Sequence, residues 1–350
     1  MNSLRTTGRN TSTLRSMLRC IGFMLALLAT SADAQNPTHN HLIGRSNPAL
    51  SGFHFRGSLP TQDSSRPALR SADTLSGVAV SYGTMDYPRV LNSGAAGMNK
   101  KGQIVGGFNI LAESGCTGGY LQAGTSFRKI AYPGSTASCT LAINDLGEIV
   151  GDYTLDGGNT YHAFLLVGTV FSAVPDPPSA ISAIAEGVDN LGNIVGAYVD
   201  SSDAVHGFVY SNGAFTVVDV PGAGYTHVHA TSPNGTILVG DYVASDGHDH
   251  GFRLKRGVLS TVDYPGATDT QLLGVNDSGD YVGNWGNGAI IQDYLEYNGF
   301  LFRSGSYVSL TLPWAGVSVT WPSAVNDKDQ IAGSYVDSNG IILGFYASAH

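Results

Sequence analysis

The sequence is poor in charged side chains, in basic residues and in long apolar runs. Only 13% of its 350 residues are charged, against 46 glycines, and this excludes a charge-rich disordered chain. Outside residues 21–29, no segment approaches the about 18 apolar residues of a membrane-spanning helix. Lys and Arg number 18 against 27 Asp and Glu, a net charge of −9. Because such a surface repels phosphate backbones, we expect no nucleic-acid partner.

Residues 1–34 are typical of a secretory signal. Four arginines precede the apolar run Ile21–Ala29, and Ala32-Asp33-Ala34 forms a cleavage pattern before Gln35. Cleavage between Ala34 and Gln35 leaves 14 basic and 26 acidic side chains, a net charge of −12. We therefore expect a secreted protein, located in the periplasm or outside the cell.

From about residue 75 onward, one unit recurs six times. Each unit reads small-x-Asn/Asp-x-Gly-x-Ile-Val-Gly-x-Tyr, then His-Gly-Phe, a Gly turn, a β-rich run and Asp-x-Pro, which predicts four short strands. The Gly of Ile-Val-Gly stands, in units one to six, at Gly106, Gly151, Gly196, Gly240, Gly283 and Gly333. Spacings of 43 to 50 residues are typical of a β-propeller and longer than most β-solenoid rungs.

The two ends of this array predict how a ring would close. Val78–Tyr87 reads as a lone fourth strand, whereas the chain ends after a third strand at 344–346. Six complete units arise only if the N-terminal strand joins the last three, which also removes an exposed sheet edge. We predict an all-β, six-bladed β-propeller over 74–350, closed in this 3+1 manner and monomeric. Residues 35–73 lack a sustained hydrophobic period and are interpreted as a flexible arm.

Three units carry His-Ala-Phe or His-Gly-Phe, beginning at His162, His206 and His250. At these residues, and over about 76–347, the chain resembles the HAF-type extracellular repeat family. The resemblance implies secretion and a β-propeller-like repeat architecture, and it implies no activity. Units one, five and six lack the histidine, so the fold does not require it.

Unit four contains two His-x-His pairs, His227 with His229 and His248 with His250, and Asp246 precedes the second pair. The two-residue period of a strand places both histidines of a pair on one face, as metal binding requires. Imidazoles with a carboxylate suit zinc or another divalent first-row ion. Three interpretations remain: a metal site, which would serve a metal-assisted hydrolase or lyase; solvated loop residues; and a metal-free acid/base site.

All three tryptophans lie within 37 residues. Trp285 occupies the repeat tyrosine position and is expected in the core, whereas Trp314 and Trp321 lie in the longest loop between units. The long loop of unit five adds Asp293, Tyr294, Glu296 and Tyr297. Exposed aromatic rings beside carboxylates can stack on a sugar and hydrogen-bond its hydroxyls. We therefore predict a binding module for an extracellular polysaccharide or cell-surface ligand; loop packing and a purely structural surface repeat are the alternatives.

The positions expected to line the ring axis are mostly small or apolar. They are Ala96, Leu141, Glu186, Ala230, Leu273 and Ser323. With Glu186 as the one carboxylate among them, a calcium-dependent hydrolase with its ion in the channel has little support. We instead place binding residues on the loops that join strands two to three and units to one another, since these vary in length.

Signal cleavage removes Cys20 and leaves Cys116 and Cys139. Two cysteines in a secreted protein are candidates for a disulfide. Cys116 lies in the two-three loop of unit one, and Cys139 lies in the loop that enters unit two. Both loops belong to the same predicted face of adjacent units, so we predict a bond between them.

Overall fold

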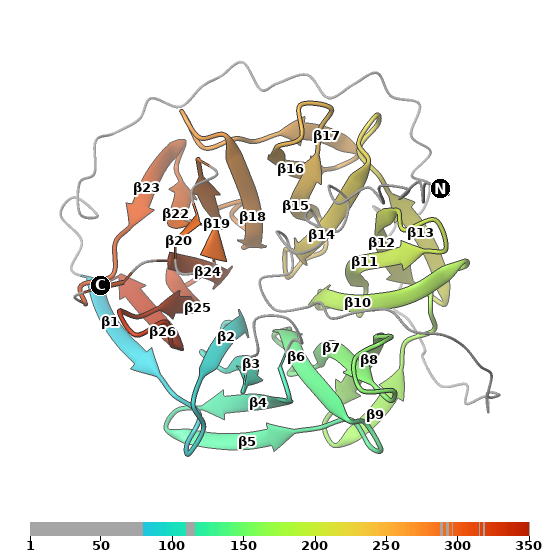
Figure 1. Cartoon of the computed structure of the whole chain (residues 1–350), viewed down its shortest axis with the longest axis horizontal. Helices are drawn as coiled ribbons and strands as arrows, with labels where there is room; N and C mark the ends of the chain where they lie inside the picture. The colour runs from blue at the N-terminus through green and yellow to red at the C-terminus, as the bar shows by residue number, and fades with distance from the viewer. Residues whose placement is uncertain are drawn as a thin grey trace, which may run out of the picture.

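The computed structural model describes residues 80–109, 116–287, 290–291, 294–295, 297–314, 316–317 and 319–349. The predicted signal and arm lie outside the described residues. Every regular element in the described part is a β-strand, so the prediction of an all-β chain is confirmed. Among these residues there is no helix with the length and apolar character that crossing a bilayer requires. Figure 1 shows the sheets arranged around a common centre.

Units one to three follow the predicted pattern of four antiparallel strands each. Unit one comprises β2 (Ser93–Met98), β3 (Ile104–Phe108), β4 (Gly118–Ala123) and β5 (Ser126–Ile130). Unit two comprises β6 (Ala137–Ile143), β7 (Ile149–Thr154), β8 (His162–Val167) and β9 (Val170–Ala173). Unit three comprises β10 (Ala180–Val188), β11 (Ile194–Asp200), β12 (Val205–Ser211) and β13 (Ala214–Val218).

Units four to six repeat this order, and unit five carries an inserted hairpin. Unit four comprises β14 (Tyr225–Thr231), β15 (Ile237–Val243), β16 (Asp249–Lys255) and β17 (Val258–Thr261). Unit five comprises β18 (Asp269–Val275), β19 (Tyr281–Gly286), the hairpin β20 (Ile290–Ile291) and β21 (Tyr294–Leu295), β22 (Asn298–Arg303) and β23 (Ser306–Leu310). Unit six comprises β24 (Val319–Val325), β25 (Gln330–Val336), β26 (Ile342–Ala349) and, from the other end of the chain, β1 (Val80–Met85).

Strand β1 pairs antiparallel with β26, from Val80 opposite Ala349 to Met85 opposite Gly344. This is the pairing that the offset of the repeats predicts. Units three and four are also joined, because β12 and β14 form one parallel pair between Val205 and Tyr225. The first strands of the units surround the centre of the molecule in Figure 1.

The apolar core lies between neighbouring sheets. One aromatic side chain from the third strand of each unit is fully buried, and these are Tyr120, Phe164, Phe208, Phe252, Phe300 and Phe345. The cluster around Phe252 includes Val195 and Val209 of unit three and Leu238 of unit four, so it joins two sheets. The repeated glycine has a steric reason: a Cβ on Gly240 would lie 1.9 Å from the carbonyl oxygen of His227.

The turns between first and second strands connect each unit to the next by hydrogen bonds. The series is Asn99 Nδ2 to Asn144 O, Asn144 Nδ2 to Asp189 O, Asn190 N to Pro233 O, Asn234 N to Asp277 Oδ1, Asn276 Nδ2 to Asn326 O and Asn326 Nδ2 to Asn99 O. The last of these joins unit six to unit one at 3.1 Å. The Asn-Asp turns therefore contact their neighbours as well as reversing the chain.

A one-residue register shift, a β-bulge, occurs in the first strand of every unit. The bulged residues are Ala96, Leu141, Glu186, His229, Leu273 and Ser323. Ala230, which was predicted to line the axis, does line the central cavity, and it directly follows the bulged residue His229 of unit four. In unit three, Asp189 N bonds to the carbonyl four residues later, whereas in unit four Ser232 N bonds to Ile237 O, five residues later. The turn of unit four is one residue longer, so the bulge lies one residue further from the Ile-Val-Gly motif than in the other units and falls at His229.

The predicted disulfide is present: Cys116 and Cys139 are bonded, with their Cα atoms 5.8 Å apart. The bond joins the segment before β4 in unit one to unit two. Cys139 lies within β6 itself, and not in the preceding loop as predicted.

Candidate metal centre

Glu186, His227 and His229 bring three ligand-type atoms together beside the centre of the ring. Glu186 lies on β10 of unit three, and both histidines lie on β14 of unit four. Glu186 Oε2 lies 2.9 Å from His227 Nε2 and 2.6 Å from His229 Nδ1. The two imidazoles stack with ring centroids 4.1 Å apart. One carboxylate oxygen therefore faces a nitrogen of each ring, and the three ligand atoms lie within 4.8 Å of one another.

The second nitrogen of each imidazole has a partner of its own. His227 Nδ1 lies 2.9 Å from the hydroxyl of Tyr225, and His229 Nε2 lies 2.5 Å from Asp241 Oδ1. Asp241 is fully buried on β15, where it pairs with His227 across the sheet. Metal-binding histidines characteristically use the other ring nitrogen in this way, because the hydrogen bond fixes the tautomer and the ring orientation. Tyr225 and Asp241 thus direct His227 Nε2 and His229 Nδ1 toward Glu186.

The electrostatics of the cluster favour a positive charge between the carboxylates. Burial alone would lower the pKa of His229, but Glu186 and Asp241 outweigh it and raise that pKa to about 10. Burial would raise the pKa of Glu186, and the two histidines reverse this and hold it well below its usual range. Both ring nitrogens of His229 face carboxylate oxygens, an arrangement that favours the imidazolium form. A divalent ion would supply the same positive charge.

Asp152 adds a further buried carboxyl to this region. It lies on β7 with 1% of its surface exposed, and neither of its oxygens has a hydrogen-bond partner among the described residues. Burial, and then the charge of Glu186, raise the pKa of Asp152 well above its ordinary value. The uncharged form of Asp152 is therefore favoured in this region.

The second histidine pair of unit four does not join this cluster. His248 Nδ1 lies 3.2 Å from Asp269 Oδ1, and His250 lies between Asp263 at 3.1 Å and Asp246 at 3.2 Å. The predicted five-residue metal set is therefore corrected: His248 and His250 contact other carboxylates, Asp269 for the first and Asp246 and Asp263 for the second, and Glu186 joins His227 and His229. The reason is topological, since His250 is on the third strand and the cluster is on the first.

No protein-family model matches the chain, and no curated protein matches it. Among solved structures, the chain is similar to a protein described as a TolB from Agrobacterium tumefaciens, with 11% identity and a TM-score of 0.52 over 74% of this chain and 91% of that one. It is also similar to the Aleuria aurantia lectin in complex with a fucose-containing ligand, with 14% identity and a TM-score of 0.44 over 74% of this chain and 94% of that one. A further similar structure is the β-propeller domain of the Pyrococcus furiosus Trilobed protease, with 7% identity and a TM-score of 0.43 over 73% of this chain and 95% of that one. The neighbours thus include β-propellers, and identities this low concern the fold alone.

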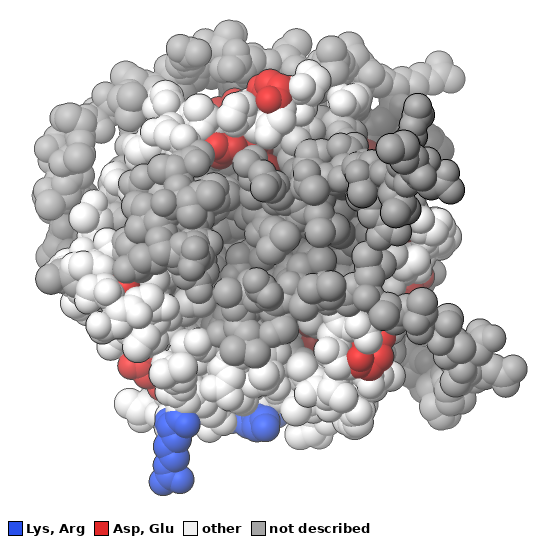
Figure 2. Space-filling model, viewed as in Figure 1, with Lys and Arg blue, Asp and Glu red and all other residues white. Residues whose placement is uncertain are grey.

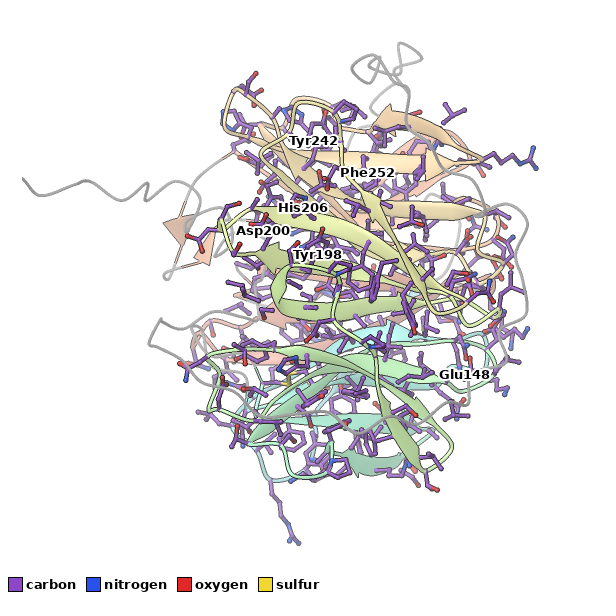
Figure 3. All side chains as sticks on the ribbon, turned by 90° about the vertical axis from the view of Figure 1, so that its right-hand side faces the viewer. Glu148, Tyr198, Asp200, His206, Tyr242 and Phe252 are labelled. Atoms are coloured by element: carbon purple, nitrogen blue, oxygen red, sulfur yellow. A yellow bond between two sulfur atoms is a disulfide. The ribbon has the colours of Figure 1, made fainter. Side chains whose placement is uncertain are left out.

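The histidine of the repeat motif has a structural partner in each unit that carries it. The pairs are His162 with Asp176, His206 with Asp219 and His250 with Asp263, at 2.9 to 3.1 Å. Each ring also packs on the repeat tyrosine of its unit. Figure 3 shows Tyr198, Asp200 and His206 together at one end of unit three, at the opposite end of the molecule from Glu148. These pairs account for the motif without a ligand.

Two side chains of the predicted sugar platform are buried. Trp321 is 8% exposed and Tyr297 is 4% exposed, and both belong to the apolar cluster that contains the disulfide. The expectation of exposed rings at these two positions is therefore wrong. Trp321 lies on strand β24 of unit six rather than in a loop, and both rings pack among side chains of units one, two and six. Asp293 and Glu296 lie outside the described residues, and for Tyr294 only its place in β21 is described.

Trp314 is half-buried at the loop that enters unit six. Its indole stacks on Tyr335 with centroids 4.9 Å apart and meets Tyr82 edge-on. Tyr264 stacks on Trp285 in unit five in the same manner, at 4.6 Å, which agrees with the expected core role of Trp285. Of the predicted platform, Trp314 alone presents a partly exposed ring among the side chains that the structure describes.

Sequence reasoning missed three members of the site: Glu186 as a ligand, and Tyr225 and Asp241 as its supports. The sequence did contain a signal for Glu186. If units three and four are aligned on their first strands, without counting through the longer turn of unit four, Glu186 and His229 occupy equivalent positions. Tyr225 and Asp241 contact the histidines because of the direction of their side chains on two neighbouring strands. No sequence motif indicates these contacts.

Proposed function

We propose that the chain is a secreted, metal-binding β-propeller that holds one divalent first-row transition ion, zinc in the first instance, at Glu186, His227 and His229. The observation that carries this proposal is the convergence of three ligand atoms whose supporting hydrogen bonds already point them at one place. Two imidazoles and one carboxylate form a ligand set typical of zinc sites that keep one position free.

The two distances from Glu186 Oε2 to the imidazole nitrogens are slightly shorter than those around a metal ion. Zinc bonds of about 2.0 to 2.2 Å place tetrahedral ligand atoms about 3.3 Å apart. Glu186 Oε2 is now 2.6 and 2.9 Å from the two ring nitrogens, so the ligands must separate by about half an ångström. Loss of the proton between Glu186 and His229 removes the attraction that holds them closer. Metal binding thus replaces one cation with another.

The direct test compares the two histidine pairs of unit four. We expect the intact mature protein to bind one equivalent of zinc, measured by metal analysis and by calorimetric titration after chelator treatment. Changing His227 and His229 together to Ala should abolish this equivalent. The matched control, His248 and His250 both to Ala, removes a pair with the same spacing and should retain it. No zinc, copper or nickel after mild purification, and none taken up on addition, would refute the proposal.

The proposal includes the finer architecture. We propose six blades closed in the 3+1 manner, with units of the HAF type. The pairing of β1 with β26 and the series of turn hydrogen bonds that returns from Asn326 to Asn99 support it. Secretion rests on the leader over residues 1–34.

A second candidate is binding of an extracellular polysaccharide through the loops that enter unit six. The half-buried indole of Trp314 beside Tyr82 favours it. Figure 2 shows acidic groups at several points of one face and basic groups at one edge, a distribution that suits neutral polymers better than acidic ones. A glycan array that compares the intact protein with Trp314→Ala tests this candidate. A third candidate, a metal-assisted hydrolase or lyase, can be tested only after metal binding has been demonstrated.

A further inference from the structure

A cavity lies among the first strands of the six units, and the bulged residues of five of them line it. Its volume is about 80 Å³. Its inner lining includes the bulged residues of five units: Ala96, Leu141, Glu186, Leu273 and Ser323. The remaining lining comes from the strand-one ends and the turns that follow them, among them Asn144, Asn326 and Pro233. The cavity therefore lies at the turn end of the channel.

Glu186 belongs both to this cavity and to the metal centre. Its Oε2 faces the two histidines, while 18% of its side-chain surface is exposed, against 1% for His227 and 7% for His229. His229 occupies the bulge of unit four, equivalent to the five bulged residues that line the cavity. Ala230 and Thr231, which follow it, are themselves lining residues. The side of the cluster away from the buried supports Tyr225 and Asp241 thus adjoins the cavity.

From this geometry we infer that the fourth coordination position of the metal opens into the axial cavity and exchanges water for a small monodentate anion. The inference rests on the proposed metal binding and specifies the ligand of that site. A tetrahedral zinc with three protein ligands has one position left for an external group. The carboxylate of Glu186 is the ligand nearest to the open space, so that group approaches past its side chain.

The size of the cavity limits what can bind. A water molecule needs about 10 to 15 Å³ of such space, so 80 Å³ holds a handful of waters or one small anion. Pockets for drug-sized molecules measure about 300 to 1,000 Å³. Hexoses and polymer chains are therefore excluded from the metal, and any polysaccharide would bind elsewhere on the molecule.

The lining also limits the charge of the ligand. Ala96, Leu141 and Leu273 are apolar, Ser323 and Thr231 contribute hydroxyls, and the carboxylates of Asp145 and Asp327 line the turn end. Lys100, at the turn level, is the one basic residue of the lining, and its amine lies 3.2 Å from Asp145. The metal is therefore the main source of positive charge for an anion. Azide, thiocyanate and formate combine the required size with affinity for a transition ion.

Cobalt(II) provides the readout, because its visible absorption reports the coordination number and ligands of the ion. We expect the cobalt-loaded mature protein to change its spectrum saturably with azide or thiocyanate, and to remain unchanged with benzoate or glucose. Ser323→Phe places a ring in the cavity from unit six, away from the ligands in units three and four. It should bind cobalt with unchanged stoichiometry and lose at least ten-fold in azide affinity. Ser172→Phe, on the exposed strand β9, is the matched control and should behave as the parent.

The outcomes separate this inference from the proposed function. If cobalt fails to bind, the metal centre itself is refuted. If cobalt binds but azide leaves the spectrum unchanged, or benzoate acts as well as azide, the metal is closed or opens elsewhere, and the inference is wrong. An undiminished azide response in folded Ser323→Phe would also overturn it. The size series on the unmutated protein decides the matter even if Ser323→Phe does not fold.

Discussion

Asn326→Ala tests ring closure at a single side chain. Asn326 is 3% exposed, and its Nδ2 donates to Asn99 O at 3.1 Å, across the junction of the two chain ends, and to Gln330 Oε1 at 2.8 Å. Its Oδ1 accepts from the backbone amides of Lys328 and Gln330. Each lost hydrogen bond costs about 1 kcal/mol net, and more where a buried partner stays dry. We expect a loss of about 3 kcal/mol, or about 5 to 10 °C in Tm.

Asn144→Ala is the matched control inside the chain. Its Nδ2 donates to Asp189 O of unit three at 2.8 Å and to Glu148 Oε2, and its Oδ1 accepts from two backbone amides of its own turn. In a closed ring, the junction of units six and one is equivalent to that of units two and three. Urea unfolding should therefore give equal losses for the two variants. If Asn326→Ala cost less than half of what Asn144→Ala costs, the closed ring would be contradicted.

Three further outcomes follow from the structure. Deletion of residues 35–73 should leave Tm unchanged in calorimetry, whereas deletion of 35–87, which removes β1, should lower it sharply; equal Tm values would contradict the role of β1. The hydrogen bond to Asp263 raises the pKa of His250 to about 9, so its stabilisation is complete below about pH 6.5 and is lost as pH rises through 9. His250→Gln should reduce that loss in unfolding measurements, and an identical pH profile would argue against the pair. Trp321→Ala should cost about 3 to 5 kcal/mol and Trp314→Ala clearly less, and equal losses would show that both rings are core.

Most of the fold could be predicted from the repeat pattern. Turn sequences, the spacing of Ile-Val-Gly and the offset between first and last units predicted the strands and the partner of β1, since all of these depend on local chemistry and on counting. The disulfide was also predictable, because only two cysteines lie outside the predicted signal and the order of the units places them in neighbouring sheets, although Cys139 is on a strand and not in the expected loop. The His-Asp pairs explain part of a further pattern: units one and five, which lack the histidine, have Ala131 and Thr311 where others have the aspartate, whereas unit six lacks the histidine and keeps Asp86.

The candidate metal site was only half predictable from the sequence. The strand period correctly placed His227 and His229 on one side, where their rings stack. The third ligand comes from a different unit, and its position depends on a bulge and on a turn with one additional residue. Burial of Trp321 depends likewise on contacts between units, because this strand residue packs beside the disulfide that joins units one and two. Contacts between units arise from ring geometry, which no pattern within a single unit encodes.

Anomalous diffraction at the zinc absorption edge, from crystals of the mature protein equilibrated with zinc, tests the central claim most directly. The account predicts one peak at about 2.0 to 2.2 Å from Glu186 Oε2, His227 Nε2 and His229 Nδ1, with its open side toward the axial cavity. A peak between Asp246 and His250 instead, or no peak beside Glu186 at saturating zinc, would contradict it.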